Sequence, residues 1–377
     1  MKYTNWTKIT KPLGLSLLTG ILIIAGNSVN MAQSVEQKPS NIIAQIPNNS
    51  NVIYVNQSLG QDTTGGGSQN APYKTINYAL QQAQSGTIIS IAPGTYSEES
   101  GETFPLIVKP GVTLRGDDVN KGQNIIIKGG GGFISPSLAG QNITIRALDN
   151  SQIIGLTITN PNKRGTGVWV ESTNPIITNN TFTNNKREGV FVTGNGSPKI
   201  QNNIFIKNAG NGLSLAKNSQ GEIRKNLFDD TGIGISIGDS VSAVIIDNQV
   251  HNNKDGIVIS GSATPIINSN IIENNIDNGL VMIGGAKPNV GTVENPGKNK
   301  IRNNGKFDIY NTNTTNLQIL IGNEVDYDKV SEGVDLGFTR PPKTTKPTTT
   351  KPTTTKPNTG KKLNIPKTNT VKKPMFK

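Results

Sequence analysis

The sequence contains no cysteine and a single histidine, His251. Without cysteine the chain forms neither disulfides nor thiolate metal sites, so its composition does not indicate a redox compartment. One histidine excludes zinc and iron sites that need several imidazole ligands, and it argues against a Ser-His-Asp triad. We therefore expect no metal site and no cofactor.

Large apolar side chains are also scarce, since hydrophobic residues make up 33% of the chain and aromatic residues 5%. Disordered proteins share this composition, but here the apolar residues gather in short β-branched runs such as residues 124–127. Short strands separated by polar turns are typical of a thin solenoid, which has a narrow core and much surface.

The net charge of +12 comes mainly from one end of the chain. Residues 341–377 contain ten lysines and no acidic residue, so 12 − 10 leaves +2 for everything before them. This Lys-Pro-Thr-rich segment is predicted to be disordered, because proline keeps it extended and charge keeps it solvated. We expect it to contact an anionic surface, and we expect no specific nucleic-acid binding.

The first 32 residues have the pattern of a secretory signal peptide. Basic residues precede an apolar run of thirteen residues at 13–25, which is shorter than the about 20 residues that a membrane span needs. We expect cleavage near residue 32, no transmembrane helix afterwards, and a secreted, periplasmic or cell-surface protein. An uncleaved N-terminal anchor is the alternative.

An internal repeat runs through the chain from about residue 150. Its pattern is an Asn, any residue, an apolar residue, several polar residues, and a Gly that opens a short apolar strand. Four columns keep one register at steps of 22 or 23 residues, which excludes chance as the explanation. The columns are Asn180, Asn203, Asn226, Asn248 and Asn270; Phe182, Phe205, Phe228, Val250 and Ile272; Ile177, Ile200, Ile223, Ile245 and Ile267; and Gly167, Gly189, Gly212, Gly234, Gly256 and Gly279.

The repeat predicts an all-β fold, a right-handed single-stranded parallel β-helix with three short strands in each coil of about 22 residues. Within the strand after each Gly, core-facing and outward residues alternate, as Leu213 and Leu215 do with Ser214. Stacked coils align like residues, so the asparagines should form a hydrogen-bonded ladder. Phe205 should lie in the core between the two phenylalanines of its column.

The expected boundaries follow from the same pattern. We expect a flexible lead-in at 33–51, a β-helix domain at 52–322, a connector at 323–340 and the basic tail at 341–377. The first part of the domain, 52–112, should form a cap with a short amphipathic helix within residues 72–83, because an open end of a solenoid exposes its core. The register of the repeat is lost after Gly285.

The cap carries a family resemblance in its short motifs. These are YVN at 54–56, GGS at 66–68, APYKTI at 71–76, SGTIISIAPGTY at 85–96, GETFPL at 101–106 and GVTL at 111–114. Over roughly residues 52–285 the chain resembles the domain-of-unknown-function family 1565. The resemblance implies a pectate-lyase-like right-handed parallel β-helix in a secreted bacterial protein, and it implies no activity.

Enzymes of the wider β-helix class have motifs that this chain largely lacks. Similarity to polygalacturonases is limited to the pair Asp229-Asp230, because His251 is not flanked by glycines and no Asn-Thr-Asp or Arg-Ile-Lys occurs. The acidic cluster of a calcium-dependent pectate lyase is not found on consecutive residues. These absences favour a non-catalytic protein that binds polysaccharide or a cell-envelope partner. The alternative is a lyase or glycoside hydrolase that acts on acidic polysaccharide.

Two groups of residues are candidates for chemistry or binding. The column after the phenylalanines places Asp229, His251 and Glu273 on successive coils, where two carboxylates beside a histidine would suit acid-base catalysis. A surface charge stripe is the alternative interpretation.

A second group lies on the strands after the glycines. Trp169 and Phe191 point outward on adjacent coils, with Arg164, Arg187 and Glu171 nearby. Exposed rings stack on sugars and arginines bind carboxylates, so this group predicts a site for acidic polysaccharide. Burial of the rings beneath a loop is the alternative.

Overall fold

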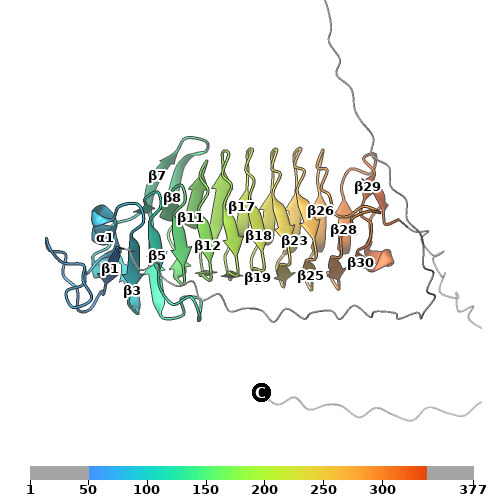
Figure 1. Ribbon diagram of the computed structural model, residues 1–377. Coiled ribbons are helices and arrows are strands. Elements are labelled where there is room, and N and C mark those ends of the chain that lie inside the picture. The colour runs from blue at the N-terminus through green and yellow to red at the C-terminus, as the bar shows by residue number, and fades with distance from the viewer. Residues whose placement is uncertain (1–50, 338–377) are drawn as a thin grey trace, which may run out of the picture. The chain divides into compact units, whose positions relative to one another are not determined.

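The computed structural model describes residues 51–337, which form one stack of coils (Figure 1). The expected signal segment, nearly all of the lead-in and the basic tail lie outside the described residues. Among residues 51–337, no helix is long and apolar enough to cross a membrane. The structure confirms the parallel β-helix, since three parallel sheets run along the stack and each regular coil contributes a strand to each sheet.

Within one coil the chain passes through the first, the second and then the third sheet. The first sheet comprises β1 (Val52–Val55), β2 (Ile88–Ile91), β5 (Thr113–Arg115), β9 (Gln152–Ile154), β12 (Ile176–Thr178), β15 (Lys199–Gln201), β18 (Glu222–Arg224), β21 (Val244–Ile246) and β24 (Ile266–Asn268). The second sheet comprises β3 (Gly94–Ser97), β6 (Ile125–Lys128), β10 (Thr157–Thr159), β13 (Thr181–Thr183), β16 (Ile204–Ile206), β19 (Leu227–Asp229), β22 (Gln249–His251), β25 (Ile271–Glu273), β27 (Lys300–Arg302) and β30 (Glu324–Val325).

The third sheet has longer strands and one antiparallel addition. It comprises β4 (Leu106–Val108), β8 (Ala139–Ala147), β11 (Gly165–Glu171), β14 (Val190–Thr193), β17 (Asn211–Leu215), β20 (Ile233–Ile237), β23 (Asp255–Ile259), β26 (Asn278–Met282) and β28 (Phe307–Asn311), and β7 (Gly131–Ser135) pairs antiparallel with β8. A short pair, β29 (Gln318–Ile319) and β31 (Val334–Asp335), follows at the C-terminal end. The helical segments are α1 (Ile76–Gln82), η1 (Glu98–Ser100) and η2 (Tyr327–Lys329).

The core consists of the predicted columns. Ile177 pairs with Ile200 and Phe182 pairs with Phe205, and all four side chains are fully buried. The Phe205 ring stacks on Phe182 at 4.8 Å and on Phe228 at 4.6 Å between ring centroids. The 22- or 23-residue register of the sequence is therefore the register of the sheets.

Asparagine ladders close two corners of each coil. The predicted ladder is present, since Asn203 Nδ2 donates to Asn226 Oδ1 at 3.0 Å and also to the carbonyl of Ile177 at 2.9 Å. A second ladder, absent from the sequence prediction, lies at the opposite end of the second-sheet strands. Its members are Asn185, Asn208, Asn253, Asn275 and Asn304, and Thr231 takes the place of an asparagine between Asn208 and Asn253. Buried amides thus satisfy backbone groups where the chain turns.

The N-terminal end is capped as expected, although the helix is shorter than the segment 72–83. It begins at Ile76 because Thr75 is the N-cap, with its hydroxyl accepting from Tyr78 N, while Tyr73 still pairs with Val55 as extended chain. Glu102 Oε1 and Oε2 accept from the backbone N–H groups of Ile76 at 2.6 Å and Asn77 at 3.0 Å. The buried carboxylate therefore binds the helix end to the first coils.

The repeat resumes after the point where the sequence loses it. Asn270 Nδ2 donates to Asn299 Oδ1 at 3.0 Å, so this coil spans 29 residues in the ladder rather than 22. Strand β27 continues the second sheet, and β30, within the segment expected as a connector, pairs with β27. Figure 1 shows these strands following the regular stack at its C-terminal end.

Candidate functional site

The predicted Asp229–His251–Glu273 column exists on the outer surface of the second sheet. Asp229 pairs with His251, His251 with Glu273, and Glu273 with Arg302. The Asp229 and His251 side chains are each about a quarter exposed, at 23% and 25%. The register therefore brings together the three residues that the sequence singled out.

The carboxylate of Asp229 is already engaged by its neighbours. Asp229 Oδ1 lies 3.2 Å from His251 Nδ1, and Asn252 Nδ2 donates to the same oxygen at 2.9 Å. Asn252 Nδ2 also lies 2.9 Å from His251 Nδ1. The imidazole is thus oriented on the sheet surface by an aspartate and an asparagine.

Glu273 belongs to an ion-pair chain. Arg302 Nε donates to Glu273 Oε2 at 2.8 Å, and Arg302 Nη1 donates to Glu324 Oε1 at 3.3 Å. The hydrogen bond and charge of Glu273 raise the pKa of Arg302. Among residues 51–337, no group of three or more His, Asp and Glu side chains is placed to hold a metal ion. This arrangement is a surface stripe of paired charges.

The predicted aromatic pair forms, but the expectation that it is exposed is wrong. The Trp169 and Phe191 rings stack at 4.6 Å with an angle of 7°, yet their exposed fractions are 0% and 8%. The reason is the β7–β8 hairpin, which folds over them and places Phe133 edge-on to Trp169 at 6.3 Å. Period-two alternation shows which way a ring points but not what covers it.

The carboxylate of Glu171 fixes the β7–β8 hairpin in place through hydrogen bonds. The carboxylate accepts hydrogen bonds from Ser135 Oγ at 2.9 Å, Ser137 N at 2.8 Å and Trp169 Nε1 at 3.1 Å. Burial alone would raise the pKa of Glu171, but these hydrogen bonds outweigh it and lower the pKa below its ordinary value. Glu171 is therefore a structural anchor in this arrangement.

The two arginines expected beside the rings do not form a carboxylate clamp. Arg187 donates to Glu188 Oε1 at 3.0 Å and to Gln141 Oε1 at 2.9 Å, so it links the segment before β14 to β8. Arg164 is exposed on the turn before β11. The structure thus assigns four of the five predicted binding residues to the attachment of the hairpin and leaves Arg164 at the surface.

Beyond the hairpin, the outer face of the third sheet carries a row of mixed polar and apolar side chains, which we call the open strip. It runs across β17, β20, β23, β26 and β28. Its outward positions are Asn211, Ile233, Asp255, Asn278 and Phe307; Ser214, Ser236, Val258, Val281 and Tyr310; and Ala216, Gly238, Ser260, Ile283 and Thr312.

An aromatic pair ends the open strip. The Phe307 and Tyr310 rings stack at 5.0 Å with an angle of 9°, and both side chains are partly exposed. The sequence prediction missed this pair because Asp308 takes the place of the column glycine, opposite Gly279, and because the preceding coil is longer. The signal that could have found it is Asn299 followed two residues later by Ile301, which repeats the Asn column.

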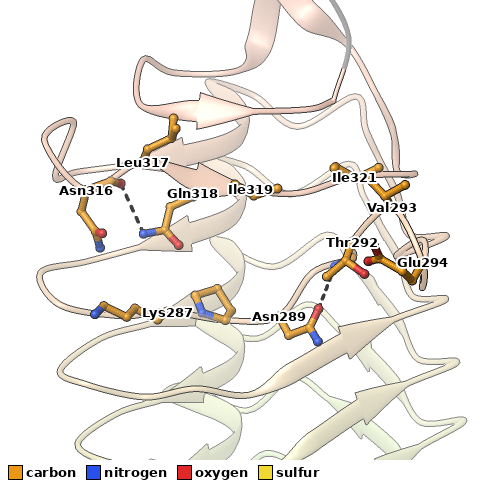
Figure 2. A pocket seen from close by; sticks show the side chains of 12 residues that line it. Lys287, Asn289, Thr292, Val293, Glu294, Asn316, Leu317, Gln318, Ile319 and Ile321 are labelled. Atoms are coloured by element: carbon orange, nitrogen blue, oxygen red, sulfur yellow. Dashed lines mark hydrogen bonds between the residues drawn. The ribbon is translucent and has the colours of Figure 1, made fainter.

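A pocket of about 630 Å³ lies between residues 287–294 and residues 316–321 on the C-terminal coils (Figure 2). Its walls include the exposed aliphatic side chains of Val293 at 73%, Leu317 at 60% and Ile319 at 53%. Its charged side chains are Lys287 and Glu294. A single carboxylate among aliphatic walls provides an apolar surface and no acid-base pair.

Comparison with known proteins identifies the class that these sheets define, the pectate-lyase-like right-handed parallel β-helix. Pectate lyase Pel9A matches with a TM-score of 0.54 and 14% identity, covering 76% of this chain and 79% of that chain. A complex of XylC with xylose matches with a TM-score of 0.50 and 11% identity, covering 73% and 70%. At these identities the likeness establishes the fold alone.

The chain belongs to the family described as "Protein of unknown function (DUF1565)", whose model matches residues 58–332. Among curated proteins, no sequence matches this chain. The family resemblance of the sequence is thereby confirmed, and it carries no activity with it.

Proposed function

We propose that this protein is an exported, non-catalytic β-helix that binds polysaccharide along the open strip. The observation that carries the proposal is the partly exposed stack of Phe307 and Tyr310 at the end of a strip that carries amide and hydroxyl side chains among aliphatic ones. Aromatic rings present flat apolar faces to sugar C–H groups, and amides and hydroxyls exchange hydrogen bonds with sugar hydroxyls.

The coil spacing supports an extended ligand. Ser214 pairs with Ser236 on the next coil, so two hydroxyls lie one strand spacing of about 4.8 Å apart, and Val258 and Val281 continue the column. Asn211 Nδ2 donates to Ser214 Oγ at 2.9 Å; Ser214 is buried, whereas Asn211 and Ser236 are partly exposed to a ligand. A chain of repeating sugars would meet repeated contacts, and its affinity would rise by avidity.

The binding function is tested by removing the rings. We expect Phe307→Ala with Tyr310→Ala to weaken retention on immobilised polysaccharide at least about fivefold, since each stacking contact contributes about 0.5–1.5 kcal/mol. Leu317→Ala is the matched control, because Leu317 is an exposed apolar side chain in the pocket, away from the strip. Equal losses in both variants would contradict the assignment to the open strip.

Catalysis is the second candidate function, and the 3.2 Å contact between Asp229 and His251 is the observation in its favour. Against it, Glu273 is bound to Arg302 at 2.8 Å, which keeps the second carboxylate ion-paired. We expect no chain cleavage from the full protein in assays for new reducing ends or unsaturated products. Turnover that His251→Ala and Asp229→Asn both abolish would establish the enzyme instead.

A further inference from the structure

The open strip contains no lysine or arginine, and its charged member is Asp255. Asp255 Oδ1 accepts from Asn278 N at 3.2 Å and from Asn278 Nδ2 at 2.8 Å, so the carboxylate is held at the strip surface by an amide. The amide and hydroxyl groups around it are neutral. The chemistry of the strip is therefore that of a neutral surface with one negative charge.

Cations at the borders of the strip are balanced by acids. Lys306 Nζ lies 2.9 Å from Asp277 Oδ1, beside the Phe307 end, and Lys217 Nζ lies 3.8 Å from Asp239 Oδ2 on the opposite border. Lys254 is exposed and directly precedes Asp255, the carboxylate of the strip, in the chain. Arg187, near the hairpin, is paired with Glu188 at 3.0 Å.

We infer that the ligand of the open strip is a neutral polysaccharide, a deepening that rests on the proposed function. A uronic-acid polymer would bring one carboxylate per sugar onto a surface that offers no cation and one carboxylate of its own. Each sugar carboxylate would lose hydration without a charged partner, which disfavours binding. Neutral sugars present only hydroxyls and C–H faces, and the strip has partners for both.

The experiment compares neutral and acidic polymers with the full chain. Affinity electrophoresis or calorimetry would use laminarin and galactomannan as neutral probes, and alginate and polygalacturonate as acidic probes. Salt at about 0.5 M screens the charges of the ten lysines in residues 341–377 to within a few ångströms. We expect binding to at least one neutral probe, lost at least about fivefold in the Phe307→Ala, Tyr310→Ala variant, and no strip-dependent binding to either acidic probe.

A variant that introduces a positive charge adds a second measurement. Ser236→Lys should give measurable binding to an acidic probe, whereas Ser236→Gln, which adds length without charge, should not. Binding of an acidic probe by the unmodified protein that requires Phe307 and Tyr310 would overturn the neutral ligand and leave the binding function standing. Absence of binding to all four probes would overturn the proposed function and the inference together.

Discussion

At the scale of single residues, the phenylalanine stack shows that the sequence repeat predicts individual contacts in the core. Phe182, Phe205 and Phe228 were placed in one column from the sequence, and all three are fully buried with their rings in contact. A column of apolar residues at a fixed period specifies neighbours directly, because parallel coils align equal positions. The core of the repeat could therefore be predicted residue by residue.

Phe205→Ala should lower the free energy of unfolding by about 3–5 kcal/mol, because it leaves a cavity between two rings in a closed core. Chemical denaturation measures the loss. Lys186→Ala, at an exposed position of the preceding coil, is the control and should stay within about 0.5 kcal/mol. A loss below about 1 kcal/mol for Phe205→Ala would show that the stack does not form.

Glu102 gives a pH prediction. Burial, which outweighs the hydrogen bonds from Ile76 and Asn77, raises the pKa of Glu102 to about 7, and Asp62 adds to the shift. A carboxyl whose pKa is raised on folding contributes stability that is complete below its ordinary pKa, and that is lost as pH rises through about 7. We expect this group to lower stability by about 2–4 kcal/mol between pH values of about 4.5 and 8.

Urea midpoints across that pH range, compared with those of Glu102→Gln, isolate the contribution. The variant should show a flatter pH dependence, whatever its absolute stability. If both proteins have the same slope, the carboxyl of Glu102 does not titrate in this window.

At the scale of elements, the β7–β8 hairpin covers the aromatic pair that the sequence predicts to be exposed. The sequence placed Trp169 and Phe191 as outward neighbours, which is what the structure has. It did not reveal the cover, because residues 131–141 form an excursion with no counterpart in the other coils, and pairing of β7 with β8 is antiparallel. Irregular elements add surface contacts that a periodic pattern does not encode.

Trp169 fluorescence tests this cover. In a Trp6→Phe background Trp169 is the single tryptophan, and we expect blue-shifted emission that resists aqueous quenchers, because the indole is fully buried. Phe133→Ala should shift the emission to the red and increase quenching, since Phe133 is the ring that packs edge-on to the indole. Exposed emission before any substitution would contradict the closed hairpin.

The asparagine ladder is the second element-scale feature. Asn226 Oδ1 accepts from Asn203 N and Nδ2, and Asn226 Nδ2 donates to Ile200 O and to Asn248 Oδ1. Asn226→Ala would leave buried donors and acceptors unpaired on both neighbouring coils. We expect a loss of about 2–4 kcal/mol in denaturant titrations.

The control is Asn195→Ala, because Asn195 is exposed on a turn. It should change stability by no more than about 0.5 kcal/mol. Equal effects of the two substitutions would mean that the ladder contributes nothing beyond an ordinary surface amide.

At the scale of the whole molecule, the stack of coils was predictable and its final coils were not. A coil of 29 residues and an aspartate in the glycine column interrupt the pattern. The repeat therefore does not predict the positions of Phe307 and Tyr310. The sequence does not predict the proposed ligand surface for the same reason. Periodicity determines where coils lie, and the exceptions to it determine where the surface differs.

The basic segment 341–377 makes a whole-molecule prediction of its own. Cosedimentation of the full chain with anionic lipid vesicles should be strong at about 0.05 M salt and weak at about 0.5 M, because exposed charges are screened over shorter distances as salt rises. A chain that ends at residue 340 lacks the ten lysines and should not sediment at either salt concentration. Salt-independent sedimentation, or equal sedimentation after truncation, would contradict the assignment.

The steady 22-residue step between Asn226, Asn248 and Asn270 makes the coil a unit that can be copied. Duplicating residues 227–248 would join one complete coil to another with every corner amide still facing an amide, and the open strip would lengthen by about 4.8 Å. Inserting a single residue within a strand would instead turn alternate side chains from core to surface. Tandem duplication or loss of whole coils would thus fit the length of the proposed binding surface to longer or shorter ligands. The number of coils is therefore the variable to compare among relatives of this chain.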